Sequence, residues 1–279
     1  MNGKLNKPGK QATNITFIFP LVLGLVATIP TCVAISGHSA PAPPASIRLL
    51  VPPEDDFFSK ELFCNGIPIK SHQVVSDQAL YLAYTRLQMM LAHLPTVTSN
   101  IVGAKVELHI IGKDQVTTDL PEWRQDKGKP LPEYNGLTRD QRTRGMGGQL
   151  TSCGEENLLQ LKKDRYFGRD ICVHEFSHVI RDYGMDEKTV ARFDGQYRKS
   201  LQAGLWVNSY AGANPDEFFA ELSMWYFGTH GDLNMKGAKP DNGPEGLRQY
   251  DRDAYQLFDD FYRGRIPVNQ KTFTTDHNH

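Results

Sequence analysis

The sequence predicts an α+β domain with a mixed sheet. Segments that are typical of strands come early in the globular part, and long segments with helical periodicity come late, which argues against a repeating βα pattern. The composition, with 39% hydrophobic and 23% charged residues, is ordinary for a folded protein. We therefore expect one domain over residues 47–266.

The first elements follow from local signals. Residues 47–51 predict a short strand that Pro52 and Pro53 stop. Ser76 is a good N-cap for a helix over residues 77–94, whose apolar residues recur at helical spacing and which Pro95 ends. Residues 105–111 alternate as in a strand, and Gly112 closes it.

The second half of the domain is expected to be mostly helical. Residues 121–140 contain proline, glycine and many charges and predict a long surface excursion. Arg144 and the glycines after it form either a lid hinge or an ordinary loop. Residues 157–161 predict a strand, either in the core or at the sheet edge, where it could pair with an extended substrate. Helices are expected over residues 171–183, 188–202, 215–227 and 247–262.

The N-terminus predicts export from the cytosol. Three lysines at positions 4, 7 and 10 precede residues 11–47, which contain no Asp, Glu, Lys or Arg. Residues 15–35 are almost continuously apolar, so residues 1–35 are interpreted as a signal peptide cleaved after Ala34. The alternative is an uncleaved membrane anchor. Residues 36–46, rich in Pro, Ala and Ser, are expected to form a linker, and residues 267–279 a flexible tail.

Charge and cysteine content limit the partners and the chemistry. The chain has 31 basic and 32 acidic residues, and this balance gives no support for nucleic-acid binding. The exported part would hold Cys64, Cys153 and Cys172. They allow one disulfide, with three possible pairings, or three buried thiols.

The strongest chemical signal is His174-Glu175-Phe176-Ser177-His178, an H-E-x-x-H motif. On a helix, residues four apart share one face, so the two imidazoles can bind one zinc ion. The glutamate between them is then placed to act as the general base towards an attacking water.

A catalytic zinc site needs a third protein ligand. Arg181 and Gly184 stand where a longer histidine motif would require a glycine and a histidine, so that form is excluded. Asp194 is a weaker candidate. Glu217 is the better one, because the segment from Asn214 begins like a helix and places Glu217 and Glu221 on one face among apolar residues.

His174-Glu-x-x-His178, Tyr210 and Glu217-Phe-Phe-Ala-Glu221 together resemble the catalytic domain of anthrax lethal factor and its relatives, including the Pro-Pro endopeptidases, which are gluzincin peptidases. The resemblance extends over residues 171–226, about a fifth of the chain. It implies a zincin-like fold, zinc ligands at His174, His178 and Glu217, and Glu175 as general base. It also implies that Tyr210 stabilises the oxyanion and that Glu221 supports a ligand histidine.

The function expected from the sequence is therefore that of an exported zinc metalloendopeptidase acting on a peptide or protein. Two alternatives remain open at this point. One is a zinc hydrolase of a non-peptide or cell-wall amide, and the other is a zincin-fold binding protein without turnover. A membrane contact is expected only if the N-terminal segment stays uncleaved. The sequence leaves the cleavage preference and the oligomeric state open.

Overall fold

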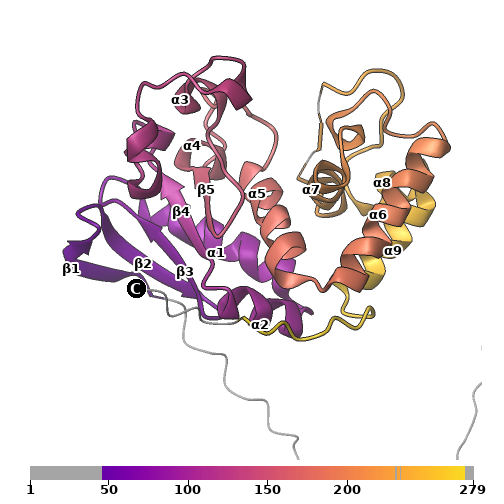
Figure 1. The fold of residues 1–279 in the computed structure, drawn as a ribbon, viewed down its shortest axis with the longest axis horizontal. Helices are drawn as coiled ribbons and strands as arrows, with labels where there is room; N and C mark the ends of the chain where they lie inside the picture. Colours follow the sequence, from indigo (N-terminus) through magenta and orange to yellow (C-terminus); the bar gives the residue numbers. More distant parts are fainter. Residues whose placement is uncertain (1–45, 230, 233, 274–279) are drawn as a thin grey trace, which may run out of the picture. The chain divides into compact units, whose positions relative to one another are not determined.

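The computed structural model describes residues 46–229, 231–232 and 234–273 (Figure 1). Residues 1–45, which include the expected export signal and all but the last residue of the expected linker, lie outside the described residues. The described part is α+β, as predicted, with its strands before residue 155 and most of its longer helices after residue 170. No helix within the described ranges is long and apolar enough to cross a bilayer.

One mixed five-stranded sheet has the order β1-β2-β3-β4-β5. Its strands are β1 (Arg48–Glu54), β2 (Phe58–Cys64), β3 (Ile67–Ser71), β4 (Glu107–Ile111) and β5 (Leu150–Gly154). Strand β2 is antiparallel to both of its neighbours, β1 and β3, whereas β4 is parallel to both β3 and β5. Strand β5 is therefore the last strand on one side of the sheet.

The sheet corrects three expectations. Strand β1 continues through Pro52 and Pro53, which an outer strand tolerates because its register with β2 is irregular there. The hairpin of β2 and β3 was not predicted; it turns at Asn65 and Gly66, both with positive φ. The expected strand over 157–161 is wrong, because Glu155–Leu158 forms the short helix α4 and the strand lies just before it, in β5.

The longer helices are α1 (Asp77–Leu91), α2 (Pro95–Gly103), α5 (Ile171–Val179), α6 (Glu187–Gln202), α7 (Pro215–Tyr226), α8 (Pro244–Tyr250) and α9 (Arg252–Tyr262). A short helix, α3 (Arg139–Arg142), lies in the surface excursion, among the 3₁₀ turns Thr117–Asp119, Pro121–Asp126 and Pro132–Tyr134. Helix α5 continues as a π-helical turn over Ile180–Gly184, and Tyr210–Gly212 is a further 3₁₀ turn.

The helix ends follow their local sequence with two exceptions. Ser76 caps α1 as predicted, by accepting from the Ala79 N–H. Pro95 does not merely end a helix; it stands in the first turn of α2. The helix expected over 247–262 is two helices, because Asp251 caps α9 and also accepts hydrogen bonds from buried Ser200 and Trp206.

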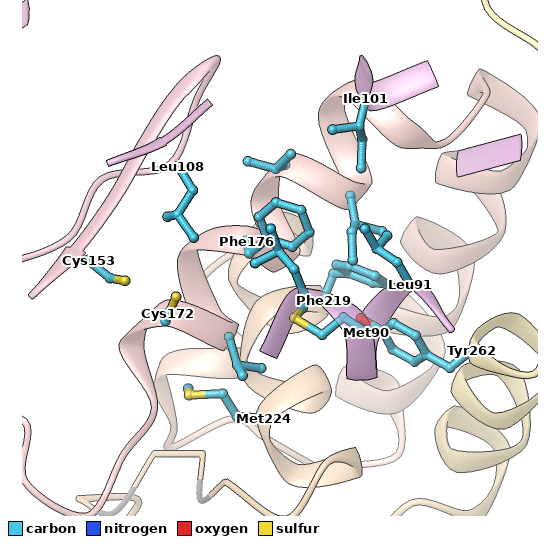
Figure 2. Close-up of a cluster of buried hydrophobic side chains, with 14 of the residues drawn as sticks. Met90, Leu91, Ile101, Leu108, Cys153, Cys172, Phe176, Phe219, Met224 and Tyr262 are labelled. Atoms are coloured by element: carbon cyan, nitrogen blue, oxygen red, sulfur yellow. The ribbon is translucent and has the colours of Figure 1, made fainter. Parts of the chain in front are cut away.

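Helix α5 lies at the centre of the core. It contacts β5 and α1 on the sheet side and α7 on the other side. Figure 2 shows that one apolar cluster extends from Leu108 of the sheet, past Phe176 of α5, to Phe219 of α7. Phe219 then packs on Phe193 and Phe258 of α6 and α9. The orientation of α5 relative to α7 is therefore fixed by packing on both sides.

The three cysteines among the described residues, Cys64, Cys153 and Cys172, are buried and unbridged. Cys153 of β5 and Cys172 of α5 point towards each other in Figure 2. Burial, together with the neighbouring Cys172, raises the pKa of the Cys153 thiol. The Cys153 sulfur thus stays in the core as a protonated, apolar group.

Residues 267–273 follow α9 without regular secondary structure. Asn100 of α2 donates from its side chain to the Asn269 carbonyl and accepts from the Lys271 N–H. The Asn269 N–H also bonds to Asp186, the cap of α6. This part of the expected tail is therefore attached to the domain; residues 274–279 lie outside the described part.

Candidate metal centre

Helix α5 presents two imidazoles on one face. Asp170 caps the helix by accepting a hydrogen bond from the Val173 N–H at 3.1 Å. The apolar residues of α5 are buried in the core, and His174 and His178 stand one turn apart. Their Nε2 atoms are 3.3 Å apart, so both rings are directed at one point.

Helix α7 brings a carboxylate to the same point. Asn214 caps this helix by accepting from the Glu217 N–H at 2.9 Å, and Pro215 fits the first turn. Glu217 Oε2 lies 3.2 Å from His174 Nε2 and 3.6 Å from His178 Nε2. Three side chains from two helices therefore converge.

The spacing of these three atoms fits a single tetrahedral metal ion. Bonds of about 2.0–2.1 Å to a tetrahedral ion place neighbouring ligand atoms about 3.3 Å apart. The observed separations of 3.2, 3.3 and 3.6 Å are close to that value. Glu217 Oε2 is also buried, with no donor among the described residues aligned on it. His174, His178 and Glu217 therefore form a group that could hold a metal ion.

The second carboxylate of α7 supports His174 from its other side. Glu221 is fully buried, and its Oε1 lies 3.1 Å from His174 Nδ1. The ring N–H is not aligned on that oxygen, so the contact is electrostatic. Arg169 donates to the same oxygen and neutralises the buried charge. Such an outer carboxylate orients a ligand imidazole so that Nε2 faces the metal position.

These carboxylates determine the charge of His174. Burial disfavours its imidazolium form, but Glu217 and Glu221 outweigh burial and raise the pKa of His174 to about 10. Burial also disfavours the Glu217 carboxylate, yet the two imidazoles hold its pKa well below the usual range. A metal ion must therefore displace a proton from His174 when it binds.

A cavity of about 300 Å³ opens beside the three converging atoms. Glu175 lines it together with His174 and Tyr210. The Glu175 carboxylate makes no hydrogen bond or ion pair with a described residue, and burial raises its pKa. An unpaired carboxylate that faces open space next to metal ligands can accept a proton from a bound water.

Two glycines of the loop before β5, Gly145 and Gly147, pack directly on Glu175 and His178. A Cβ on Gly145 would lie 2.7 Å from Ile171 Cγ2 and 3.0 Å from Glu175 Cγ. A Cβ on Gly147 would lie 3.2 Å from His178 Cβ. No larger residue fits at position 145 without displacing Ile171 or Glu175.

The same loop is anchored and does not have the character of a hinge. Met146 pairs with Ser152 of β5 through backbone hydrogen bonds of 3.1 and 2.8 Å, which covers the outer side of that strand. Arg144 is buried and donates two hydrogen bonds of 2.6 Å to Glu156 of α4. Of the two interpretations of Arg144, the ordinary anchored loop is the one observed.

Tyr210 lies next to His174 and Glu217 and lines the same cavity as Glu175. Its hydroxyl donates to Glu217 Oε1 at 2.9 Å, and its ring centre is 6.1 Å from that of His174. Its N–H donates to Asp232 at 2.7 Å, which fixes the backbone. Burial and the charge of Glu217 raise the pKa of Tyr210, so the hydroxyl remains a donor.

The structure brings together all six side chains that the sequence singled out: His174, Glu175, His178, Tyr210, Glu217 and Glu221. Asp194, the weaker candidate for third ligand, is elsewhere; it pairs with Arg181 at 2.7 Å.

Sequence reasoning missed Arg142, Gly145 and Arg169, which line the cavity with Glu175. Arg142 ends helix α3 and Gly145 lies in the loop after it, whereas Arg169 lies in the segment just before α5. No periodicity or spacing relates these residues to the motif. From the sequence alone, the glycines after Arg144 are interpreted only as part of a lid hinge or of an ordinary loop. The contact of Gly145 with Glu175 is formed by the tertiary structure and has no local signal in the sequence.

No family model matches this sequence, and no curated protein matches it significantly.

Proposed function

We propose that this chain is a zinc-dependent metallopeptidase of gluzincin type, with His174, His178 and Glu217 as ligands. One observation carries the proposal. The Nε2 atoms of both histidines and Glu217 Oε2 converge within 3.2–3.6 Å beside a cavity that Glu175 lines. A purely structural cluster would have no need of an open cavity at that point.

The donor set favours zinc over other common cations. Two imidazole nitrogens and one carboxylate, with a fourth position open to the cavity, are typical of catalytic zinc. Calcium and magnesium prefer sites made of oxygen ligands. When bound, a zinc ion supplies Lewis-acid polarisation of a substrate carbonyl and lowers the pKa of a coordinated water.

The chain's own residues would move the protons. Glu175 takes a proton from the attacking water as the new C–O bond forms, and it delivers that proton to the amine nitrogen as the C–N bond breaks. Tyr210 would donate its hydroxyl hydrogen bond to the carbonyl oxygen as negative charge develops there. In the structure this hydroxyl donates to Glu217 Oε1, so it already lies next to a proposed metal ligand.

The architecture is consistent with a zincin-like domain. A mixed sheet and α1 pack on one side of the motif helix α5, and the glutamate helix α7 packs on the other. Export from the cytosol belongs to the same proposal and depends on the apolar segment 15–35 of the sequence, outside the described residues.

The decisive variant is Glu175→Gln, which keeps the size of the side chain and removes the base. The zinc-loaded wild type should cleave members of a peptide library, and a chelator should abolish this cleavage. Glu175→Gln should bind one zinc per chain and lose at least about 100-fold in kcat. Glu133→Gln, an exposed glutamate outside the cavity, is the matched control and should cleave like the wild type.

A panel that adds peptidoglycan separates the rival functions. If the chain hydrolyses peptidoglycan and none of the peptides, Glu175 keeps its proposed role as general base, and the substrate is a cell-wall amide. If wild type and Glu175→Gln behave alike on every substrate while both hold zinc, the chain is a binding protein and the enzyme proposal is wrong.

A further inference from the structure

The charged side chains of the cavity wall differ in whether they already have partners. Arg169 donates to Glu221, and Asp232 accepts the backbone N–H groups of Tyr210 and Asn234. Arg142 lines the same cavity, and its side chain makes no hydrogen bond or ion pair with a described residue. Its guanidinium is close enough for its charge to act on the Glu175 carboxylate and the Tyr210 hydroxyl.

The backbone that carries Arg142 is held in place, although the guanidinium is unpaired. Helix α3 begins with a capping box in which Thr138 and Gln141 satisfy each other's backbone N–H groups. Arg139 is buried, pairs with Asp126 at 2.6 Å and lies 3.8 Å above the Trp123 ring. Arg142 thus projects from an anchored turn, which reduces the entropy lost when it binds a partner.

We propose that Arg142 binds a carboxylate of the substrate at a subsite adjacent to the scissile bond. This inference depends on the proposed function, since it names the substrate class of the same cavity. A guanidinium can hold a carboxylate through two parallel hydrogen bonds, which gives both affinity and orientation. The carboxylate can come from an acidic side chain, as in an endopeptidase substrate, or from a free C-terminus, as in a carboxypeptidase substrate.

Matched peptides distinguish these sources. Each peptide cleaved by the zinc-loaded full chain is made with Glu or with Gln beside the scissile bond, and with a free or amidated C-terminus. The wild type should prefer one carboxylate form by about 10- to 100-fold in kcat/KM. Arg142→Ala should lose this preference, so that its kcat/KM values for the acid and neutral forms lie within about threefold of each other. With a third matched peptide that has Lys at that position, Arg142→Glu should cleave the Lys peptide faster than the Glu peptide.

Arg198→Ala, on the exposed face of α6 and outside the cavity, removes the same charge and should retain the preference. Equal cleavage of acid and neutral forms by the wild type would overturn the subsite. If the wild type cleaves no peptide, the proposed function fails, and the subsite is then tested by binding. In that case the zinc-loaded chain should bind fluorescent carboxylate peptides more tightly than their amides, and Arg142→Ala should abolish the difference; equal binding overturns the inference.

Discussion

Two histidines of this domain, His109 and His174, are each buried between two carboxylates, but the rest of their surroundings differ. His109 of β4 is hydrogen-bonded at both ring nitrogens, to Glu122 at 2.7 Å and to Glu107 at 3.1 Å. The ring of Phe58 packs on it with centres 4.3 Å apart. His174 also lies between two carboxylates. However, a second imidazole and a cavity lie next to its ring. His109 instead has aligned acceptors at both ring nitrogens and an aromatic ring packed on it.

The comparison shows which feature identifies a metal group. A buried carboxylate oxygen without an aligned donor does not, because Glu122 Oε2 and Glu217 Oε2 both have that property. Burial and paired charges do not distinguish the His109 cluster (His109, Glu107 and Glu122) from the His174 cluster (His174, His178 and Glu217) either. What distinguishes them is that three acceptor atoms converge at ligand spacing next to open space. His109 thus belongs to a structural ion pair, whereas His174 belongs to the group that could hold a metal ion and is a ligand in our proposal.

The largest expected difference between the clusters is in metal binding. Glu217→Gln removes the anionic ligand and should reduce the zinc bound at micromolar concentrations from one ion per chain to near zero. Glu122→Gln, the matched change beside His109, should leave the zinc content at one. Zinc at 100 times its Kd should stabilise the wild type by about 2.7 kcal/mol, or about 5–11 °C in Tm, and should not stabilise Glu217→Gln.

Zinc content and thermal melts with and without chelator measure both effects. Equal zinc loss in the two variants would contradict the distinction drawn between the clusters.

One methyl group at position 145 would crowd Glu175, which lines the cavity next to His174. Gly145→Ala places a Cβ against Ile171 and Glu175, so the carboxylate must move. A displacement of about 1 Å can cost about 100-fold in rate. Since this contact requires Glu175 to shift by only a few tenths of an ångström, we expect kcat to fall by about 10- to 100-fold with zinc still bound. Gly195→Ala, on α6, meets no atom within 4 Å and should leave kcat unchanged. Wild-type kcat in Gly145→Ala would show that Glu175 tolerates displacement.

Changing Glu221, which supports His174, should weaken zinc binding less than changing a ligand does. Glu221→Gln keeps the shape and removes the charge that orients the Nδ1 side of the ring. Outer carboxylates of this kind typically contribute about 10- to 100-fold to metal affinity, so we expect a higher zinc Kd with unchanged stoichiometry. Competition with a fluorescent chelator measures it. Complete loss of zinc would mean that Glu221 is itself a ligand, whereas an unchanged Kd would remove its supporting role.

The metal group could be predicted from the sequence because each helix that forms it has local signals. The His174–His178 spacing, and Asn214 and Pro215 before Glu217, specify faces and helix starts by themselves. That these faces meet is decided by the packing of α5 on α7, which the sequence supported only through its resemblance to the gluzincins.

The sheet was predicted less well, for identifiable reasons. The Asn65-Gly66 turn between β2 and β3 is a local hairpin signal that was overlooked. The error at 157–161 was a matter of position, since the strand ends at Gly154 and Glu155 begins a helix. Arg142 carries no local signal, because its role depends on a cavity formed by segments distant in sequence.

The smallest expected effect is the pH dependence contributed by His109. Burial lowers the pKa of this imidazole, but Glu107 and Glu122 outweigh burial and raise it above 6.5. A raised folded-state pKa stabilises the fold fully below the unfolded pKa, and this stabilisation disappears as pH rises through the folded pKa. Each unit of the increase corresponds to about 1.4 kcal/mol.

The free energy of unfolding in chelator should therefore fall more steeply with pH above about 6.5 in the wild type than in His109→Gln. The chelator keeps the His174 group metal-free in both proteins, so its own titration cancels in the comparison. Urea melts at successive pH values measure the two slopes. Parallel slopes would mean that His109 is neutral in the folded state, and the charge assigned to this ion pair would be wrong.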